Sequence, residues 1–170
     1  PRPQDGLQFL AGSAAAVTFG DASFDGALML KSLHHVPMDA MDAALTEVAR
    51  VVRPGGLLYV SEPIYGGAFN ELVRLYNDEG VVRTAAQAAL DRAVAAGIHW
   101  QAEAERRFAQ PVRFRDWPDF AQRMLYPSFA DHGITPALEA RVRAKFEPHL
   151  GPEGARFMRP LHVRLLRRRA

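Results

Sequence analysis

The 170-residue sequence contains no cysteine. Disulfide bonds, thiolate nucleophiles and sulfur-ligated metal sites are therefore excluded, and any chemistry must use other side chains. Lysine is also scarce, occurring only at Lys31 and Lys145, so arginine supplies nearly all of the positive charge. The formal net charge of +2 is too small to indicate a polyanionic partner, and we expect no nucleic acid to bind.

Long apolar runs are missing as well. No segment approaches the roughly 18 apolar residues that span a bilayer, and the first residues lack the basic and apolar regions of a signal peptide. We therefore predict a soluble, cytoplasmic protein without membrane contact. The basic run Arg167–Arg169 is more typical of a solvated tail than of a nucleic-acid contact. With 48% hydrophobic residues, a chain of this length predicts one domain.

Three apolar runs predict strands, at residues 7–12, 24–30 and 57–62. The second run is apolar without alternation, which is typical of a strand buried on both faces in a parallel sheet with helices on both sides. Between it and the third run, residues 38–52 repeat apolar side chains at helical spacing, and Pro54–Gly56 ends that helix. This order predicts a right-handed βαβ unit.

The pattern changes after the third predicted strand. Amphipathic helices are expected at residues 69–80, 84–97, 115–126 and 136–149. Residues 100–114 are compatible with a strand or a loop, whereas residues 155–168 alternate apolar and basic side chains as a strand does, and should pair beside the third predicted strand. Within the single domain we distinguish a cofactor-side βαβ part, a helical lid or substrate region and a final strand, at residues 1–63, 64–150 and 151–170.

Three segments, in this order, resemble the class I S-adenosylmethionine-dependent methyltransferases, and in particular those of methyltransferase type 11: Gly12–Ala14 with Phe19–Asp25, then Leu33–Pro37, then Glu47–Leu58. Each segment alone is a weak signal, but their order and spacing are specific. The resemblance implies an α/β fold, a Rossmann-like methyltransferase sheet with an added helical lid. It also implies S-adenosylmethionine as cofactor and methyl transfer to a small-molecule substrate.

The glycine-rich part of that family is not found in the sequence. A family member begins with a strand, a Gly-x-Gly-x-Gly turn and a helix, followed by a strand that ends in an acid for the ribose hydroxyls. Gly55–Gly56 and Gly66–Gly67 follow the wrong elements to replace that turn. We therefore expect an N-terminally incomplete sheet whose first two strands are absent, and interpret the chain as a fragment or ordered part of the enzyme.

Two consequences follow from this interpretation. By itself the chain should bind S-adenosylmethionine poorly and be inactive, and residues 24–30 should present an unpaired strand edge that favours a homodimer. The alternative is a cofactor-free methyltransferase-like module that acts through protein contacts.

The resemblance also suggests cofactor-binding residues. Ser13 stands where the family usually has an aspartate that accepts from the adenine amine, and Ala14 would donate its backbone N–H to the ring. Leu30, Lys31 and Ser32 leave the next strand where the family packs the methionine and ribose portion, and we expect backbone contacts there. Two alternatives stay open, because Ser13 is also a common turn residue and Lys31 is compatible with a solvated surface lysine.

The candidate catalytic residues are His35, Glu62 and Tyr65. Methyl transfer from a sulfonium is an in-line displacement, and a base helps only when the acceptor is protonated. Of His34 and His35, one should pack behind the cofactor and the other face the substrate. Either is a candidate general base, because the unperturbed pKa of histidine in general suits that role. Glu62 and Tyr65 follow the third predicted strand, where the family often lines its acceptor pocket, although a strand-end cap and a core position are the alternatives.

We predict no metal site, because adjacent histidine side chains diverge and no carboxylate or third histidine stands at ligand spacing. The later aromatic residues should be mostly core, with a few forming an apolar lid over a small aromatic or aliphatic acceptor: Phe69, Tyr76, Trp100, Phe108, Trp117, Phe120, Tyr126 and Phe129. The acceptor atom, whether oxygen, nitrogen or carbon, is left open.

Overall fold

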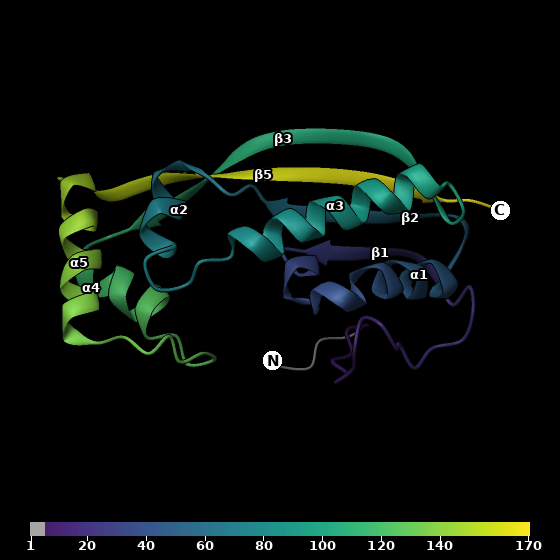
Figure 1. The fold of residues 1–170 in the computed structure, drawn as a ribbon, viewed down its shortest axis with the longest axis horizontal. Helices are drawn as coiled ribbons and strands as arrows, with labels where there is room; N and C mark the ends of the chain where they lie inside the picture. Colours follow the sequence, from purple (N-terminus) through teal and green to yellow (C-terminus); the bar gives the residue numbers. More distant parts are fainter. Residues whose placement is uncertain (1–5) are drawn as a thin grey trace.

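The fold is built on a mixed sheet, seen in a computed structural model that describes residues 6–170 (Figure 1). The strands lie in the order β1 (Phe24–Leu30), β2 (Val52–Pro63), β5 (Gly154–Arg168) and β3 (Trp100–Phe114), and the short β4 (Leu150–Gly151) pairs with β5. β1 and β2 are parallel, whereas β5 runs antiparallel to β2 and to β3. The predicted pairing of the last strand with the third predicted strand is therefore confirmed.

The predicted order of strand, helix and parallel strand is also confirmed. A 3-10 turn, η2 (Met38–Ala40), leads into α1 (Met41–Val51), which connects β1 to β2. β2 begins earlier than predicted, at Val52, because the Pro-Gly-Gly segment forms an irregularity within the strand rather than a separate turn. The backbone of Gly55 there has a φ of +79°, a conformation that glycine adopts without a steric penalty.

Alanine substitutions should separate the two glycines of this segment. Gly55→Ala is expected to cost about 1 kcal/mol of stability, because an L-residue is strained at positive φ. Gly56→Ala should cost more, about 2 kcal/mol, since the added Cβ would lie against backbone that must shift. That Cβ would be 2.6 Å from the carbonyl oxygen of Asp25. Urea unfolding midpoints measure both effects, and unchanged midpoints in the two variants would refute the argument.

A first hydrophobic core lies between the sheet and two helices, α1 and α3 (Gly80–Ala96). The sheet contributes Met29, Leu58, Val60, Trp100 and Leu166. Within the described residues both long helices pack into this one core, so the expectation of helices on both sides is wrong for this part of the sheet. The apolar run of β1 is consequently buried on one side only, and the side chain of Leu28 is 70% exposed.

A second core lies at the other end of the long strands β3 and β5 (Figure 1). It is formed by the helices α2 (Gly67–Val73), α4 (Trp117–Phe120), η3 (Ala121–Leu125) and α5 (Pro136–Phe146), followed by the 3-10 turn η4 (Glu147–His149). Three of the four helices predicted after β2 are thus confirmed, with α3, α4–η3 and α5 in the expected places. Residues 100–114 form a strand.

The helix predicted at residues 69–80 is only half correct. α2 ends at Val73, and a turn separates it from α3, which begins at Gly80. The side chain of Asp78 accepts a hydrogen bond from the backbone N–H of Gly80 at 3.0 Å, and Asn77 donates to the side chain of Glu79 at 3.1 Å. Such local side-chain hydrogen bonds compete with helical backbone bonds and explain the interruption.

The strand predicted at residues 7–12 is not formed. Leu7, Phe9 and Leu10 are exposed, and the chain continues into a tight turn in which the N–H of Ala16 donates to the carbonyl of Ser13. A strand needs a neighbour for its backbone groups, and within residues 6–170 no strand pairs with the outer edge of β1. The apolar pattern alone could not supply that neighbour.

The arginine run near the end of the chain is not a solvated tail. The guanidinium of Arg167 binds the carboxylate of Glu103 at 2.8 Å and donates to the carbonyl of Gly55 at 2.9 Å. Arg168 donates to the carbonyl of Ala49, also at 2.8 Å. Arg167 thus joins β5 to β2 and β3, and Arg168 joins β5 to α1. Across residues 6–170, none of the helices has both the length and the apolar character required to cross a membrane.

The segment before β1 is attached to α1 through Glu47 and Arg50. Glu47 accepts from the N–H of Val17 at 2.9 Å, and Arg50 donates to the carbonyl of the same residue at 3.0 Å. Arg50 also binds Glu47 and Asp21, both at 2.7 Å. The side-chain hydrogen bonds of Arg50, followed by the N–H of Val17, lower the pKa of Glu47 from 4.5 to about 2.

This lowered pKa predicts a pH dependence of stability. A carboxyl group whose folded pKa is depressed contributes stability that is fully present above pH 4.5 and is lost as the pH falls towards about 2. Glu47→Gln should therefore lose less stability than the wild type between pH 5 and pH 3, measured by urea unfolding. Glu153→Gln is the matched control, because Glu153 is exposed and makes no ion pair within the described part of the chain. Equal losses in wild type and Glu47→Gln would contradict the prediction.

Candidate functional site

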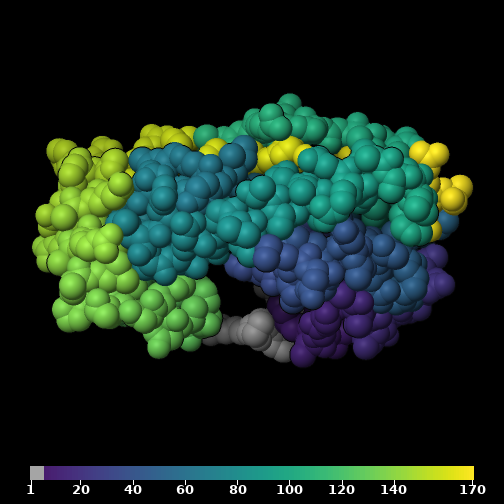
Figure 2. Space-filling model, viewed as in Figure 1, coloured from purple at the N-terminus to yellow at the C-terminus, as the bar shows by residue number. Residues whose placement is uncertain are grey.

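A cavity of about 660 Å³ lies between the two hydrophobic cores. Its walls come from the end of β1 and the loop that follows, from α2, from the start of α3, from residues 123–132 and from β5. Figure 2 shows the surface notched between the segment around residues 120–130, in green, and the N-terminal part, in blue and purple. The volume is in the range of pockets that hold small molecules.

Glu62 organises the loop that follows β1. It is fully buried, and one carboxylate oxygen accepts from the backbone N–H groups of Ser32 at 3.2 Å and Leu33 at 2.8 Å. The other oxygen binds Nδ1 of His34. The carboxylate does not line the cavity, so the geometry favours a positioning role for Glu62 over direct contact with an acceptor.

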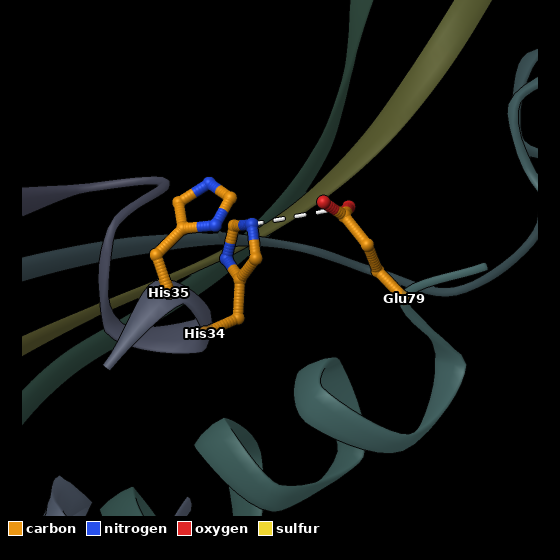
Figure 3. A group of neighbouring side chains, drawn as sticks. All are labelled: His34, His35 and Glu79. Atoms are coloured by element: carbon orange, nitrogen blue, oxygen red, sulfur yellow. Dashed lines mark ion pairs between the residues drawn. The ribbon is translucent and has the colours of Figure 1, made fainter. Parts of the chain in front are cut away.

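His34 and His35 lie side by side on the 3-10 turn η1 (Leu33–His35) (Figure 3). Their ring centroids are 4.1 Å apart, so the expectation that adjacent histidines diverge is wrong here. Both rings line the cavity, but His34 is buried and His35 is exposed. His35 is thus the more accessible imidazole, while His34 is oriented by its bond to Glu62.

Glu79 completes this cluster from the start of α3. One oxygen lies 3.9 Å from Nε2 of His34, and the same oxygen accepts from Arg83 at 2.6 Å. Burial raises the pKa of Glu79, but the hydrogen bonds and charge of Arg83 outweigh it and hold the pKa below its ordinary value. Sequence spacing could not reveal Glu79, because the fold brings it to the histidines from a distant element.

His34, His35 and Glu79 place three potential ligand atoms within 4.8 Å of one another. No carboxylate stands at ligand spacing from the two histidines in the sequence, but the fold brings Glu79 to them. However, the guanidinium of Arg83 occupies the carboxylate that a cation would need. The arrangement favours a charged hydrogen-bond network over a metal centre, and the absence of a metal stays a prediction.

Some of the backbone groups predicted to contact the cofactor at the end of β1 are hydrogen-bonded within the protein instead. Leu30 and Lys31 line the cavity, and Lys31 has a φ of +55°, which turns the chain away from the strand. The N–H of Lys31 donates to the carbonyl of Ser61 at 2.7 Å, and that of Ser32 donates to Glu62. These two N–H groups are therefore not free for a ligand.

Ser13 and Ala14 lie in the turn before β1 and do not line the cavity. The hydroxyl of Ser13 accepts from the N–H of Ala15 at 3.2 Å, which is the hydrogen bonding of a turn residue. Ser13 is exposed and Ala14 is half-buried. A contact of either residue with adenine stays a prediction.

Tyr65 is not brought together with His35. It lines a neighbouring cavity of about 560 Å³, together with His162 and Arg107, and this cavity shares Pro63 and Arg83 with the first one. A hydrogen bond with Asp78 is the main cause that raises the pKa of its hydroxyl. The structure therefore places this candidate away from the histidine pair.

Of the eight aromatic residues considered for the lid, Phe69 and Phe129 line the cavity with the histidines. Phe129 is 86% exposed, whereas Phe69 also belongs to the second core. The others do not line the cavity. Trp100 is in the first core, Trp117, Phe120 and Tyr76 belong to or pack against the second core, and Phe108 and Tyr126 are exposed.

Comparisons with known proteins agree with this arrangement. Residues 1–60 match the family model described as a methyltransferase domain. The fold is that of a class I methyltransferase. Among solved structures, a Bacillus halodurans C-125 protein assigned as a methyltransferase matches with a TM-score of 0.62 at 13% identity, covering 96% of this chain and 78% of that one. The YcgJ protein of Bacillus subtilis matches with a TM-score of 0.57 at 18% identity, covering 94% and 70%.

Curated methyltransferases are similar in sequence. The demethylmenaquinone methyltransferase of Mycobacterium tuberculosis is 37% identical over 112 residues, which cover 66% of this chain and 43% of that protein. The O-methyltransferase rstn1 of Aspergillus nomiae is 46% identical over 56 residues, which cover 33% and 24%. The matched segments thus span less than half the length of these methyltransferases.

The same fold also carries other chemistry. The [4+2]-cyclase SpnF matches with a TM-score of 0.51 at 18% identity, covering 95% of this chain and 57% of that one. Identities this low show a shared fold alone, so an activity has to be argued from the residues of the site.

Proposed function

We propose that this chain takes part in S-adenosylmethionine-dependent methyl transfer to a small-molecule acceptor bound in the 660 Å³ cavity. The supporting observation is the position of that cavity. It opens where the parallel strands β1 and β2 end, lined by Leu30 and Pro63, and this is where open α/β sheets bind ligands. His35 is exposed at the same place, next to the buried His34.

The residues present fit one side of the cofactor. Leu30 offers an exposed apolar side chain at the end of β1, and Lys31 lines the same cavity beside it. When bound, S-adenosylmethionine supplies a methyl group already activated for displacement. The glycine turn and the ribose-binding acid of the family do not occur in this sequence. The 170 residues by themselves should therefore bind the cofactor weakly.

The protein's own groups then orient the acceptor and handle its proton. Glu62 fixes the loop and the ring of His34, which packs beside His35. His35 accepts the proton of an acceptor hydroxyl or amine, because its imidazole is exposed to the cavity. Phe69 and Phe129 cover the acceptor and reduce its contact with water.

The direct test is methyl transfer by the protein as its gene encodes it. The protein is incubated with S-adenosylmethionine and a panel of small phenols, amines and carboxylic acids, and the panel is analysed by mass spectrometry. We expect S-adenosylhomocysteine together with an acceptor that is heavier by one methylene unit. The proposal would be contradicted if no acceptor in the panel led to turnover of the cofactor and calorimetry showed no cofactor binding.

One observation favours the second candidate, a cofactor-free module that acts through protein contacts. Within residues 6–170 the outer edge of β1 has no strand partner, and Leu28 and Leu30 beside it are exposed. Such an edge is a template for pairing with another chain, including a second copy of this one. A defined dimer without cofactor binding, seen by analytical ultracentrifugation and calorimetry, would favour the module over the enzyme.

A further inference from the structure

The cavity that we assign to the acceptor carries an excess of positive charge. Its charged lining residues are Lys31, Arg83, Arg123 and Arg159 against a single acid, Glu79. Positive lining alone does not identify a ligand, because arginines are often neutralised by their own neighbours. The partners of each arginine therefore decide which guanidinium is free to bind a ligand.

Arg83 and Arg123 are occupied within the protein. Arg83 binds Glu79 through two nitrogens, at 2.6 and 3.1 Å, and also donates to Asn70 at 2.9 Å. Arg123 donates to Asp119 at 3.1 Å and to the carbonyl of Arg113 at 2.9 Å. Each of these two guanidinium groups is therefore paired with a carboxylate of the protein itself.

Arg159 differs from both. It projects from β5 and is half-buried, yet among residues 6–170 its guanidinium has no ion pair and no hydrogen-bond partner. It lies over the ring of Phe69, 4.8 Å from the centroid, which fixes its position without using its N–H donors. Burial, followed by repulsion from Arg83, lowers the pKa of Arg159. The nearby carboxylate of Glu79 offsets only part of this, and a half-buried guanidinium without a hydrogen-bonded acceptor is costly unless an anion binds to it.

We propose that the acceptor carries a carboxylate that binds to Arg159, attached to an apolar body that packs on the side chains of the same cavity. This inference rests on the proposed function and specifies its substrate class. The planar guanidinium presents paired N–H donors that match the two oxygens of a carboxylate. The apolar part is provided by Phe69, Val73, Met124 and Phe129, which line the cavity around it.

The carboxylate and the methyl-accepting atom are different groups of this acceptor. A carboxylate bound to a guanidinium has its charge neutralised and is a poor nucleophile. The candidate base His35 comes from the loop after β1, whereas Arg159 comes from β5, so the two residues contact the acceptor from separate elements. Arg159 therefore acts as a specificity residue, and the reaction occurs at a hydroxyl, amine or carbon elsewhere on the molecule.

The test is binding of octanoate and of octanamide to the full chain, measured by calorimetry without cofactor. Wild type should bind the carboxylate about tenfold more tightly than the neutral amide, as expected for one charge-assisted contact. Arg159→Met should remove this preference while leaving octanamide binding unchanged, and Arg159→Lys should retain part of it. Arg156→Met is the matched control, because Arg156 is an exposed arginine of the same strand outside the cavity.

Three results would overturn the inference. The first is equal affinity of the wild type for octanoate and octanamide, which includes weak binding of both. The second is a preference for octanoate that survives Arg159→Met. The third is displacement of octanoate by S-adenosylmethionine, which would assign Arg159 to the cofactor. Unfolding midpoints of the variants show whether a lost preference reflects lost folding, and Arg159→Lys supplies the test if the methionine variant is unstable. The binding test needs no cofactor, so it separates the two proposals. Carboxylate binding without methyl transfer would count against the proposed function alone. Methylation of neutral acceptors would count against this inference alone.

Discussion

Glu62→Ala is expected to lower the free energy of unfolding by about 3–5 kcal/mol, because it leaves several donors around a buried position unsatisfied, each at a cost of about 1–3 kcal/mol. The substitution leaves three donors without an acceptor, namely the N–H groups of Ser32 and Leu33 and the Nδ1 side of His34. The side chain of Glu62 is fully buried near the end of β2, so water cannot readily replace it as acceptor. Guanidinium chloride unfolding at neutral pH measures the loss.

Glu62→Gln is the second variant to be compared with the wild type. Its amide oxygen can still accept from the two backbone N–H groups, so the loss should be smaller, about 1 kcal/mol. The amide nitrogen would face His34, whose Nδ1 must then accept instead of donate, which changes the tautomer of the ring. Nitrogen chemical shifts of His34 report this change. An alanine variant within about 1 kcal/mol of the wild type would show that the carboxylate does not hold the loop.

His35→Ala is expected to lower kcat about 100-fold in a preparation that shows methyl transfer, provided that the acceptor is protonated at rest. The affinity for S-adenosylmethionine should change little, because the loss concerns proton transfer and not cofactor contacts. Steady-state kinetics and cofactor titration separate the two effects. His35 is exposed, so its removal should leave the unfolding midpoint near that of the wild type.

Tyr65→Phe serves as the control for this experiment. Tyr65 follows the end of β2, and its ring lines the other cavity, so we expect nearly unchanged kcat and KM. Wild-type kinetics in His35→Ala would remove His35 from the site. A larger effect of Tyr65→Phe than of His35→Ala would mean that the acceptor binds in the second cavity.

Patterns within short stretches of sequence were sufficient for much of the fold. The apolar run of residues 24–30, the helical spacing of residues 38–52 and the alternation of residues 155–168 predicted β1, α1 and β5. Each of these elements has a single apolar period, and the helix is followed by a clear stop signal. Local propensity and tertiary packing therefore agree. The strand expected at residues 7–12 failed because a strand also needs a neighbour, and none pairs with it within the described residues.

The family resemblance placed the candidate site at the ends of β1 and β2, and the cavity beside Leu30 and His35 lies there. What the sequence alone determined is therefore the succession of elements, which follows from local periodicity, and the edge of the sheet proposed for ligand binding, which follows from the family resemblance. Residue roles within the site depended on contacts between distant segments, which no local pattern contains.

Only the tertiary structure separated Tyr65 from His35 and buried Glu62 beneath the loop. It also brought Glu79 to the histidine pair and left Arg159 without a partner in the described part of the chain. The physical reason is the same in each case. Burial, hydrogen bonding and uncompensated charge arise from which segments pack together, and the chain sets those neighbours only when it folds.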